Sequence, residues 1–251
     1  MNDEERSDLI THLTELRTRV IRAIVYVALG MIAIWFLFDR LFLFLTRPIV
    51  SALGEEAGRL HPFTPFEGAF VRLGFVLVGG IVVSLPFIIY EIWAFVAPGL
   101  TRSERRSVGP FIPVAMLLFF LGVSMAYLLT GPAVKALLYL NPPNTEFLLN
   151  LNQTVLQLLR FYLAFGICFQ IPIVIVVLAL LGIVDSRLLI SRWREAVILI
   201  FVVAAIATPT WDPITLTAAA LPVVLLYAGT IAVVKLIERG RRRAAEDEAS
   251  G

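Results

Sequence analysis

The 251-residue chain has few charged residues and few of the residue types that build catalytic and metal centres. Charged residues make up 16% of it, whereas soluble domains carry about 25%. Cys168 is the only cysteine, so no intrachain disulfide can form, and the two histidines, His12 and His61, are far apart in the sequence. The apolar runs contain no Ser-Lys or paired-Asp set. We therefore expect no enzyme activity, no metal site and no cofactor.

Two further features restrict the class of protein. The net charge of +2 is too small to indicate a nucleic-acid partner. The first nine residues include four acids, and no small-residue cleavage site follows, so a secretory leader is not expected. The first apolar segment should therefore be retained as a membrane span.

The sequence does contain six long apolar runs, which raise the hydrophobic content to 59%. A membrane-spanning helix needs about 20 such residues. We expect an all-α integral membrane protein with six transmembrane helices over about 20–45, 69–97, 108–132, 157–183, 194–210 and 213–235. The fifth run is short, about 24 Å at 1.5 Å per residue, less than the roughly 30 Å hydrocarbon core. Residues 1–238 should form one membrane domain, and 239–251 a disordered tail.

Lysine and arginine predict the orientation. With six spans both termini lie on one side, and that side carries all but six of the 21 basic residues. Because basic residues stay in the cytoplasm, both termini should be cytoplasmic. The six exceptions are Arg40, Arg47, Arg59, Arg72, Lys135 and Arg160.

A polar helix precedes the first span and runs directly into it. Its apolar residues recur at helical spacing, which suits a helix on a membrane surface. Glu15 and Arg19 are four residues apart, so one interpretation is an ordinary ion pair on a solvated face. In the first cytoplasmic loop, Thr101 and Glu104 have capping-box spacing, so Glu104 could simply start a helix.

Two other motifs concern the helices themselves. Thr64-Pro65-Phe66-Glu67 combines an N-cap residue, a proline at the first helical position and a capping-box acid, so Glu67 should be structural. Gln170 is the one amide near the middle of a span, next to Pro172. It could form a helix–helix hydrogen bond, or mark a polar hollow or partner site.

Four motifs occur in one order along the chain: His12-Leu13-x-Glu15-Leu16-Arg17-x-Arg19, Thr64-Pro65-x-Glu67, Phe95-x-x-Pro98-x-Leu100-x-x-x-Glu104-Arg105-Arg106 and Phe165-Gly166-x-x-Phe169-x-x-Pro172. Together they resemble the TatC family, the multispanning core of the twin-arginine protein translocase. The resemblance extends from about Leu9 to Lys235. It implies a six-helix wall, curved and concave.

The resemblance also implies a receptor for twin-arginine signal peptides. Glu15 and Glu104 match the acidic positions of the family, and Phe95 matches its aromatic residue beside the loop. His12, Leu16, Arg17 and Arg19 fall in the same signal-peptide motif. The family positions that shape loops and caps are matched by Pro48, Thr64, Glu67, Pro98, Leu100 and Arg105.

The implied partners are the single-span TatA and TatB proteins, precursor signal peptides, membrane lipids and further copies of the chain. The implied location is the prokaryotic cytoplasmic membrane, with export of folded proteins driven by the proton gradient. Two positions depart from the family, which often has Glu where Gln170 stands and Gln where Glu91 stands. We therefore interpret Gln170 as a hydrogen-bonding position for a partner helix. A secondary transporter of a small solute is the alternative, with an enzyme third.

Overall fold

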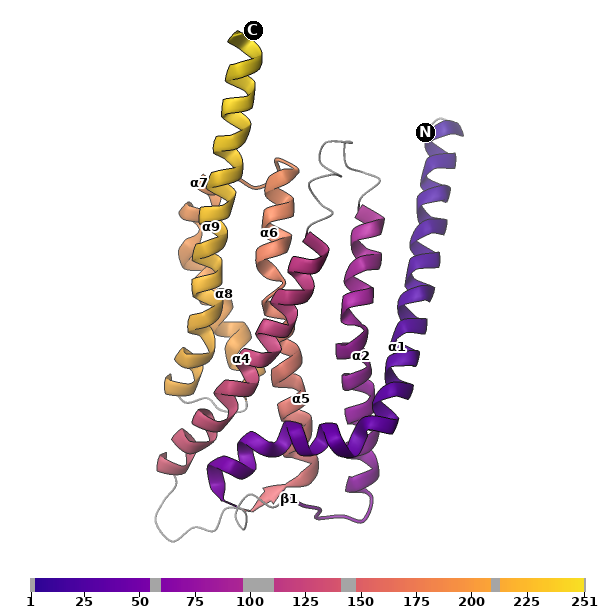
Figure 1. Ribbon diagram of the computed structural model, residues 1–251, viewed down its shortest axis with the longest axis vertical. Coiled ribbons are helices and arrows are strands. Elements are labelled where there is room, and N and C mark those ends of the chain that lie inside the picture. The colour runs from indigo at the N-terminus through magenta and orange to yellow at the C-terminus, as the bar shows by residue number, and fades with distance from the viewer. Residues whose placement is uncertain (1–2, 55–59, 97–110, 141–147, 209–212, 251) are drawn as a thin grey trace. The chain divides into compact units, whose positions relative to one another are not determined.

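The computed structural model describes residues 3–54, 60–96, 111–140, 148–208 and 213–250, and these are helical apart from short turns and two strands (Figure 1). The all-α fold class is therefore confirmed. The elements are α1 (Asp3–Leu53), β1 (Leu60–His61), α2 (Glu67–Val96), α4 (Phe111–Leu140), β2 (Leu149–Asn150), α5 (Leu151–Cys168), α6 (Ile171–Leu180), α7 (Ser186–Ser191), α8 (Trp193–Ala207) and α9 (Pro213–Ser250).

Five segments of the described chain are long and apolar enough to cross a bilayer: 13–53, 67–92, 112–138, 151–180 and 215–240. They correspond to five of the six expected spans. The expected fifth span coincides with α8, whose 15 residues rise about 22 Å. This length is below the usual 17 to 25 residues of a span, so the count of six stays a prediction.

The first helix is longer than its expected span. α1 covers 51 residues, so the polar N-terminal helix and the first apolar run form one continuous element. Its apolar part alone, 13–53, would rise about 62 Å, twice the hydrocarbon thickness. Figure 1 shows the C-terminal part of α1 turning aside, and Asp39 and Arg40 lie exposed in this half.

Two helices, α9 and α4, extend further towards the C-terminus than the sequence predicts. α9 stays helical through 239–250, where we expected a disordered tail. Alanine, arginine and glutamate dominate this stretch and are strong helix formers, and no proline interrupts them. α4 continues to Leu140, eight residues beyond the expected end of the third span, and 141–147 lie outside the described residues.

The fourth span is broken in two. α5 ends at Cys168 and α6 begins at Ile171, with Pro172 in its first turn. Proline has no N–H to donate, so the Cys168 carbonyl loses its helical partner there. The Gln170 carbonyl instead accepts from Ile173 and Val174, at 3.1 and 3.2 Å, and this starts α6.

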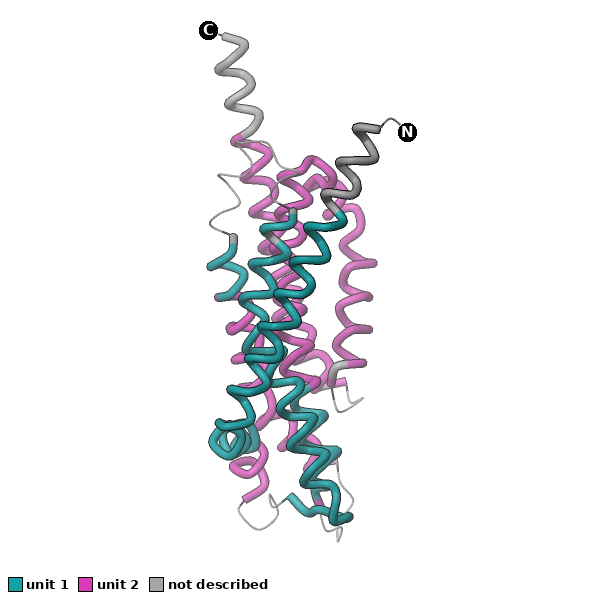
Figure 2. The backbone as a smooth tube through the Cα atoms, turned by 90° about the vertical axis from the view of Figure 1, so that its right-hand side faces the viewer, with its two compact units in different colours: residues 1–47, 60–116, 149–159 teal, residues 48–59, 117–148, 160–251 magenta. Residues whose placement is uncertain are grey.

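The chain divides into two compact units, coloured separately in Figure 2. Unit 1 comprises 1–47, 60–116 and 149–159. Its core joins Ile34 of α1 to Val71, Phe75 and Val76 of α2 and to Val155 of α5. The parallel pairing of β1 with β2, Leu60 opposite Leu149 and His61 opposite Asn150, adds two short strands that the sequence did not predict.

Unit 2 comprises 48–59, 117–148 and 160–251. Within it α9 packs against α6, α7 and α8. Phe119 of α4 is fully buried against Gly166 of α5, where any side chain on the glycine would collide with the ring. Large apolar side chains also point outward, among them Ile206 at 78% exposure, as expected for a protein whose solvent is lipid.

Candidate functional site

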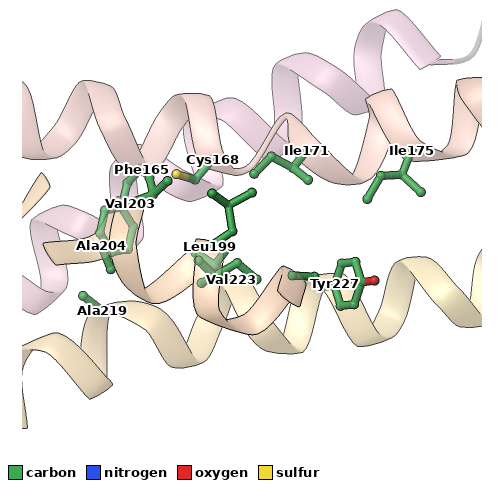
Figure 3. Close-up of a pocket in the computed structure, with 12 residues that line it drawn as sticks. Phe165, Cys168, Ile171, Ile175, Leu199, Val203, Ala204, Ala219, Val223 and Tyr227 are labelled. Carbon is green, nitrogen blue, oxygen red and sulfur yellow. The ribbon is translucent and has the colours of Figure 1, made fainter. Parts of the chain in front are cut away.

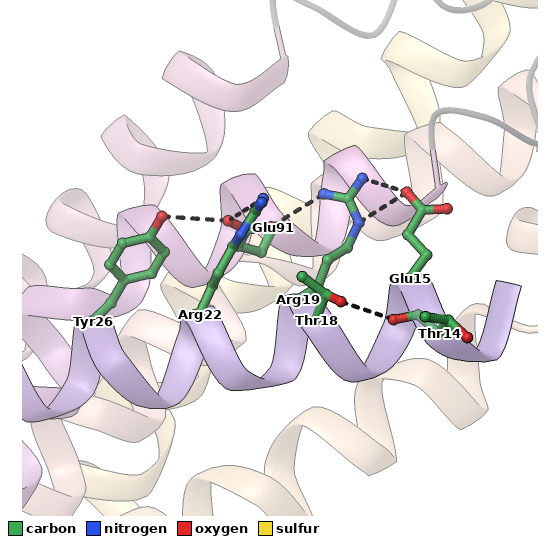
Figure 4. A network of polar contacts seen from close by, with 7 residues as sticks. All are labelled: Thr14, Glu15, Thr18, Arg19, Arg22, Tyr26 and Glu91. Carbon is green, nitrogen blue, oxygen red and sulfur yellow. Dashed lines mark hydrogen bonds and ion pairs between the residues drawn. The ribbon is translucent and has the colours of Figure 1, made fainter. Parts of the chain in front are cut away.

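Arg19 of α1 joins two carboxylates (Figure 4). Its Nε and Nη2 donate to Oε1 of Glu15 at 3.1 and 2.5 Å, and its Nη1 donates to Oε2 of Glu91 at 3.1 Å. The expected i,i+4 pair between Glu15 and Arg19 is therefore present. The sequence did not predict the second half of the contact, because Glu91 lies 72 residues away on α2.

Glu91 is the buried member of this network. Its side chain is 4% exposed, and three groups of α1 surround the carboxylate: Arg19, Arg22 at 3.9 Å, and the Tyr26 hydroxyl at 3.4 Å. A carboxylate removed from water loses several kcal/mol of hydration and needs opposite charge to compensate. The cluster of Glu15, Glu91, Arg19 and Arg22 carries two charges of each sign and is neutral overall.

Close helix packing places Glu91 beside α1. At the crossing, Gly30 of α1 faces Gly80 and Ser84 of α2, and a Cβ added to Gly30 would come within 2.6 Å of the Gly80 carbonyl oxygen. Ser84 Oγ also donates to the Tyr26 carbonyl at 2.7 Å. Small residues let the two backbones approach, and Glu91 lies two helical turns beyond Ser84 on the same element.

An apolar groove of about 450 Å³ adjoins the ion cluster. Among the described residues, Arg19 and Glu91 are the charged ones in its lining, and Leu16, Val20, Ile88 and Phe95 are among its apolar walls. The groove is formed by α1 and α2 within unit 1. It can therefore accept an apolar segment while a charged neighbour of that segment meets the ion cluster.

The residues that the sequence assigned to signal-peptide binding are placed only in part. Glu15, Leu16, Arg19 and Phe95 gather at the groove and its ion cluster, whereas Arg17 is exposed. His12 lies in α1, and the structure describes only its backbone. The residues outside the described part of the chain are Pro98, Leu100, Glu104 and Arg105.

The expected cap residues have local structural contacts. Glu67 accepts the Phe63 N–H at 3.0 Å and the Asn150 side-chain amide at 3.3 Å, so its carboxylate ties the start of α2 to the end of β2. The expected capping box would have used the Thr64 N–H instead. Thr64 is exposed, and its carbonyl accepts the Glu67 N–H at 3.2 Å. Pro48 is buried within α1.

Unit 2 has a separate cavity of about 200 Å³ (Figure 3). Its walls come from α5, α6, α8 and α9 and are apolar apart from Cys168 and Tyr227. Gln170 is half-buried in the turn between α5 and α6, and it is not among the residues that line this cavity. No group of three possible metal ligands occurs among the residues that the structure describes.

Sequence reasoning noted Glu91 only as a departure from the family and did not assign it to the site, although a signal was present. The residues three and four positions away on α2 are Phe87, Ile88, Ala94 and Phe95, all apolar. A carboxylate inside a span with no partner on its own helix must find its counter-ion on another helix. The sequence alone does not show which helix supplies it.

Comparison with known proteins agrees with this architecture. The family model described as "Sec-independent protein translocase protein (TatC)" matches residues 11–222. The chain is 34% identical to a TatC protein of Koribacter versatilis, covering 96% of this chain and 91% of that one. It is 37% identical to a TatC protein of Synechocystis, with 94% and 91% covered.

Solved structures give the same result. A crystal structure of the twin-arginine translocase receptor TatC aligns with a TM-score of 0.78 at 32% identity, covering 90% of this chain and 98% of that one. A second structure of that receptor in DDM gives 0.79 at 31%, covering 88% and 98%. These matches favour a translocase component over the small-solute transporter and the enzyme. The chain belongs to the TatC family of Sec-independent protein translocase proteins.

Proposed function

We propose that this chain is the receptor for twin-arginine signal peptides within a translocase that exports folded proteins. Glu15 and Glu104 would each receive one arginine of the peptide on the cytoplasmic face. The apolar stretch that follows the arginines would then enter the groove between α1 and α2.

The accessible carboxylate of Glu15 carries this proposal. Its Oε1 accepts from Arg19, while Oε2 has no partner among the described residues, and the side chain is 33% exposed. One oxygen therefore remains for an incoming donor. Arginine suits a carboxylate because its planar fork can donate two parallel hydrogen bonds, which lysine cannot do, and the first of these bonds would go to the open Oε2.

The groove supplies the second recognition element. In a signal peptide an apolar segment follows the arginines, and in the groove apolar walls lie next to a carboxylate. Leu16 and Phe95 stand where the two parts meet, Leu16 one residue from Glu15 and Phe95 one helical turn from Glu91. Burial of apolar surface would add affinity, and the charge pairing would add selectivity.

The chain would act in the cytoplasmic membrane together with TatA and TatB single-span proteins and further copies of itself, with both termini in the cytoplasm. The excess of arginine and lysine on the expected inner side supports this orientation. The proton gradient would drive transport through the assembled partners, because the described spans hold no chain of titratable groups across the bilayer.

The test is peptide binding to the full chain in nanodiscs, with a fluorescent twin-arginine peptide and its twin-lysine counterpart. We expect the arginine peptide to bind about tenfold more tightly. The E15Q/E104Q double variant should lose this preference. E195Q is the matched control, since Glu195 pairs with Arg192 on an exposed face of unit 2. Equal binding of both peptides, or an unaffected double variant, would refute the proposal.

A further inference from the structure

Arg19 occupies the carboxylate that the proposed function assigns to the signal peptide. Both of its hydrogen bonds to Glu15 go to Oε1, through Nε and Nη2. A peptide arginine needs both oxygens of Glu15 to bind as a fork. It can have both only if Arg19 gives up Oε1.

Glu91 supplies a second position for Arg19. Nη1 of Arg19 is already 3.1 Å from Oε2 of Glu91. The other groups around Glu91 are held loosely, with Arg22 at 3.9 Å and the Tyr26 hydroxyl at 3.4 Å from Oε1. The carboxylate of Glu91 therefore has capacity to take the Arg19 guanidinium with both oxygens.

The exposed fractions show why this second position matters. The Arg19 side chain is 17% exposed, so a displaced Arg19 could not simply return its charge to water. Without Glu91, removal of Arg19 from Glu15 would leave a largely buried cation unpaired, which is strongly unfavourable. With Glu91 the guanidinium keeps a counter-ion throughout the exchange.

We infer that Arg19 is an internal competitor of the signal peptide at Glu15, and that Glu91 is the positioning residue that receives it on displacement. The inference rests on the proposed function. Competition filters ligands, because only a donor that forms two parallel bonds to Glu15 replaces Arg19, whereas a lysine with one point charge does not. Arg19 thus determines specificity, and the acid at position 91 is what makes its displacement possible in this chain.

The test uses the same nanodisc assay with R19Q, E91Q and R19Q/E91Q, and with E195Q as control. R19Q should bind the twin-lysine peptide about tenfold more tightly than the wild type does. It should strengthen binding of the twin-arginine peptide by less, so the preference for arginine falls. E91Q should weaken binding of the twin-arginine peptide about fivefold, because Arg19 then has no second carboxylate to move to and stays on Glu15. The double variant should behave like R19Q, because Glu91 acts only through Arg19.

Two results would overturn the inference: weaker binding of the twin-arginine peptide by R19Q, or an equal effect of E91Q with and without Arg19. If the wild-type chain does not prefer arginine, or the E15Q/E104Q variant keeps that preference, the proposed function fails instead. Thermal unfolding of each variant checks the fold. Should E91Q not fold, the ratio of the two affinities in R19Q decides the question alone.

Discussion

At the scale of single residues, two carboxylates, one buried and one half-buried, have different roles. Glu91 is held by cations and lines a groove that a ligand can reach. Glu238 of α9 accepts the backbone N–H and the hydroxyl of Ser186, both at 2.6 Å. It therefore satisfies a donor at the first turn of α7, which Asp185 also caps through the Leu188 N–H at 2.6 Å.

Replacement of Glu238 by Ala should lower the free energy of unfolding by about 1–3 kcal/mol, because it leaves the buried Ser186 N–H and hydroxyl without their acceptor. E238Q keeps one acceptor oxygen, so its free energy of unfolding should lie between those of E238A and the wild type. The measurement is thermal unfolding in detergent, with limited proteolysis of 183–192 as a local readout. Equal stability of E238A and the wild type would contradict the structural role.

Single residues also show how far sequence reasoning reaches at the site. The Glu15–Arg19 pair follows from helix spacing alone and was predicted. The bridge to Glu91 depends on α1 and α2 packing at Gly30 and Gly80, a long-range fact that no local pattern encodes. Glu104 remains a prediction from the family resemblance, since it lies outside the described residues.

At the scale of elements, the α1–α2 crossing controls the site. A Cβ on Gly80 would lie 2.5 Å from Cγ of Met31 and 2.8 Å from its backbone nitrogen. A backbone atom cannot rotate away as a side chain can, so any larger residue here must push the helices apart. The distance between Arg19 and Glu91 is set by the same two helices.

The Gly80→Leu variant should therefore lose about 1–3 kcal/mol of stability through overpacking, and its twin-arginine peptide affinity should fall together with the Arg19–Glu91 contact. Gly229→Ala is the control, because nothing lies within 4 Å of its added Cβ. This control should gain up to about 1 kcal/mol from better helix propensity. Unchanged stability and binding in Gly80→Leu would mean that the crossing is looser than described.

Helices were the readily predicted elements, and their interruptions were not. Five of the expected apolar runs overlap helices that are long and apolar enough to cross a bilayer, with ends that differ by two to eight residues. The division of the fourth span into α5 and α6 depends on Pro172 and on the turn at Gln170, which the sequence placed within one continuous span. β1 and β2 have two residues each, too few for any alternation to be visible.

The turn at Gln170 is also a candidate contact for a partner helix. We expect a photo-crosslinker that replaces Gln170 to capture a single-span TatA or TatB partner in native membranes, because Gln170 places a polar side chain at the turn between α5 and α6 inside a span, and polar residues inside spans often mark contact sites. The same crosslinker at Phe36, exposed in α1 of unit 1, is the control and should capture neither partner. Capture at Phe36 alone would move the partner site away from the break.

At the scale of the whole molecule, α8 decides the topology. Its 15 residues rise about 22 Å, and a bilayer core is about 30 Å thick. Local thinning of the bilayer or shelter by neighbouring helices lets a short helix cross, and α8 packs against α9 within unit 2. If α8 crosses, the number of spans is even and both termini share one side. If it does not, the termini lie on opposite sides.

Cysteine labelling separates these cases in a C168S background, which removes the natural thiol. T18C near the N-terminus, F63C before α2 and R239C near the C-terminus place one exposed thiol each. With six spans and basic residues inside, a membrane-impermeant maleimide should label F63C in spheroplasts, and T18C and R239C only in inverted vesicles. Labelling of R239C and F63C from the same side would exclude α8 as a span. It would also place the arginines of 239–243 outside the cell, against the overall excess of basic residues expected on the cytoplasmic side.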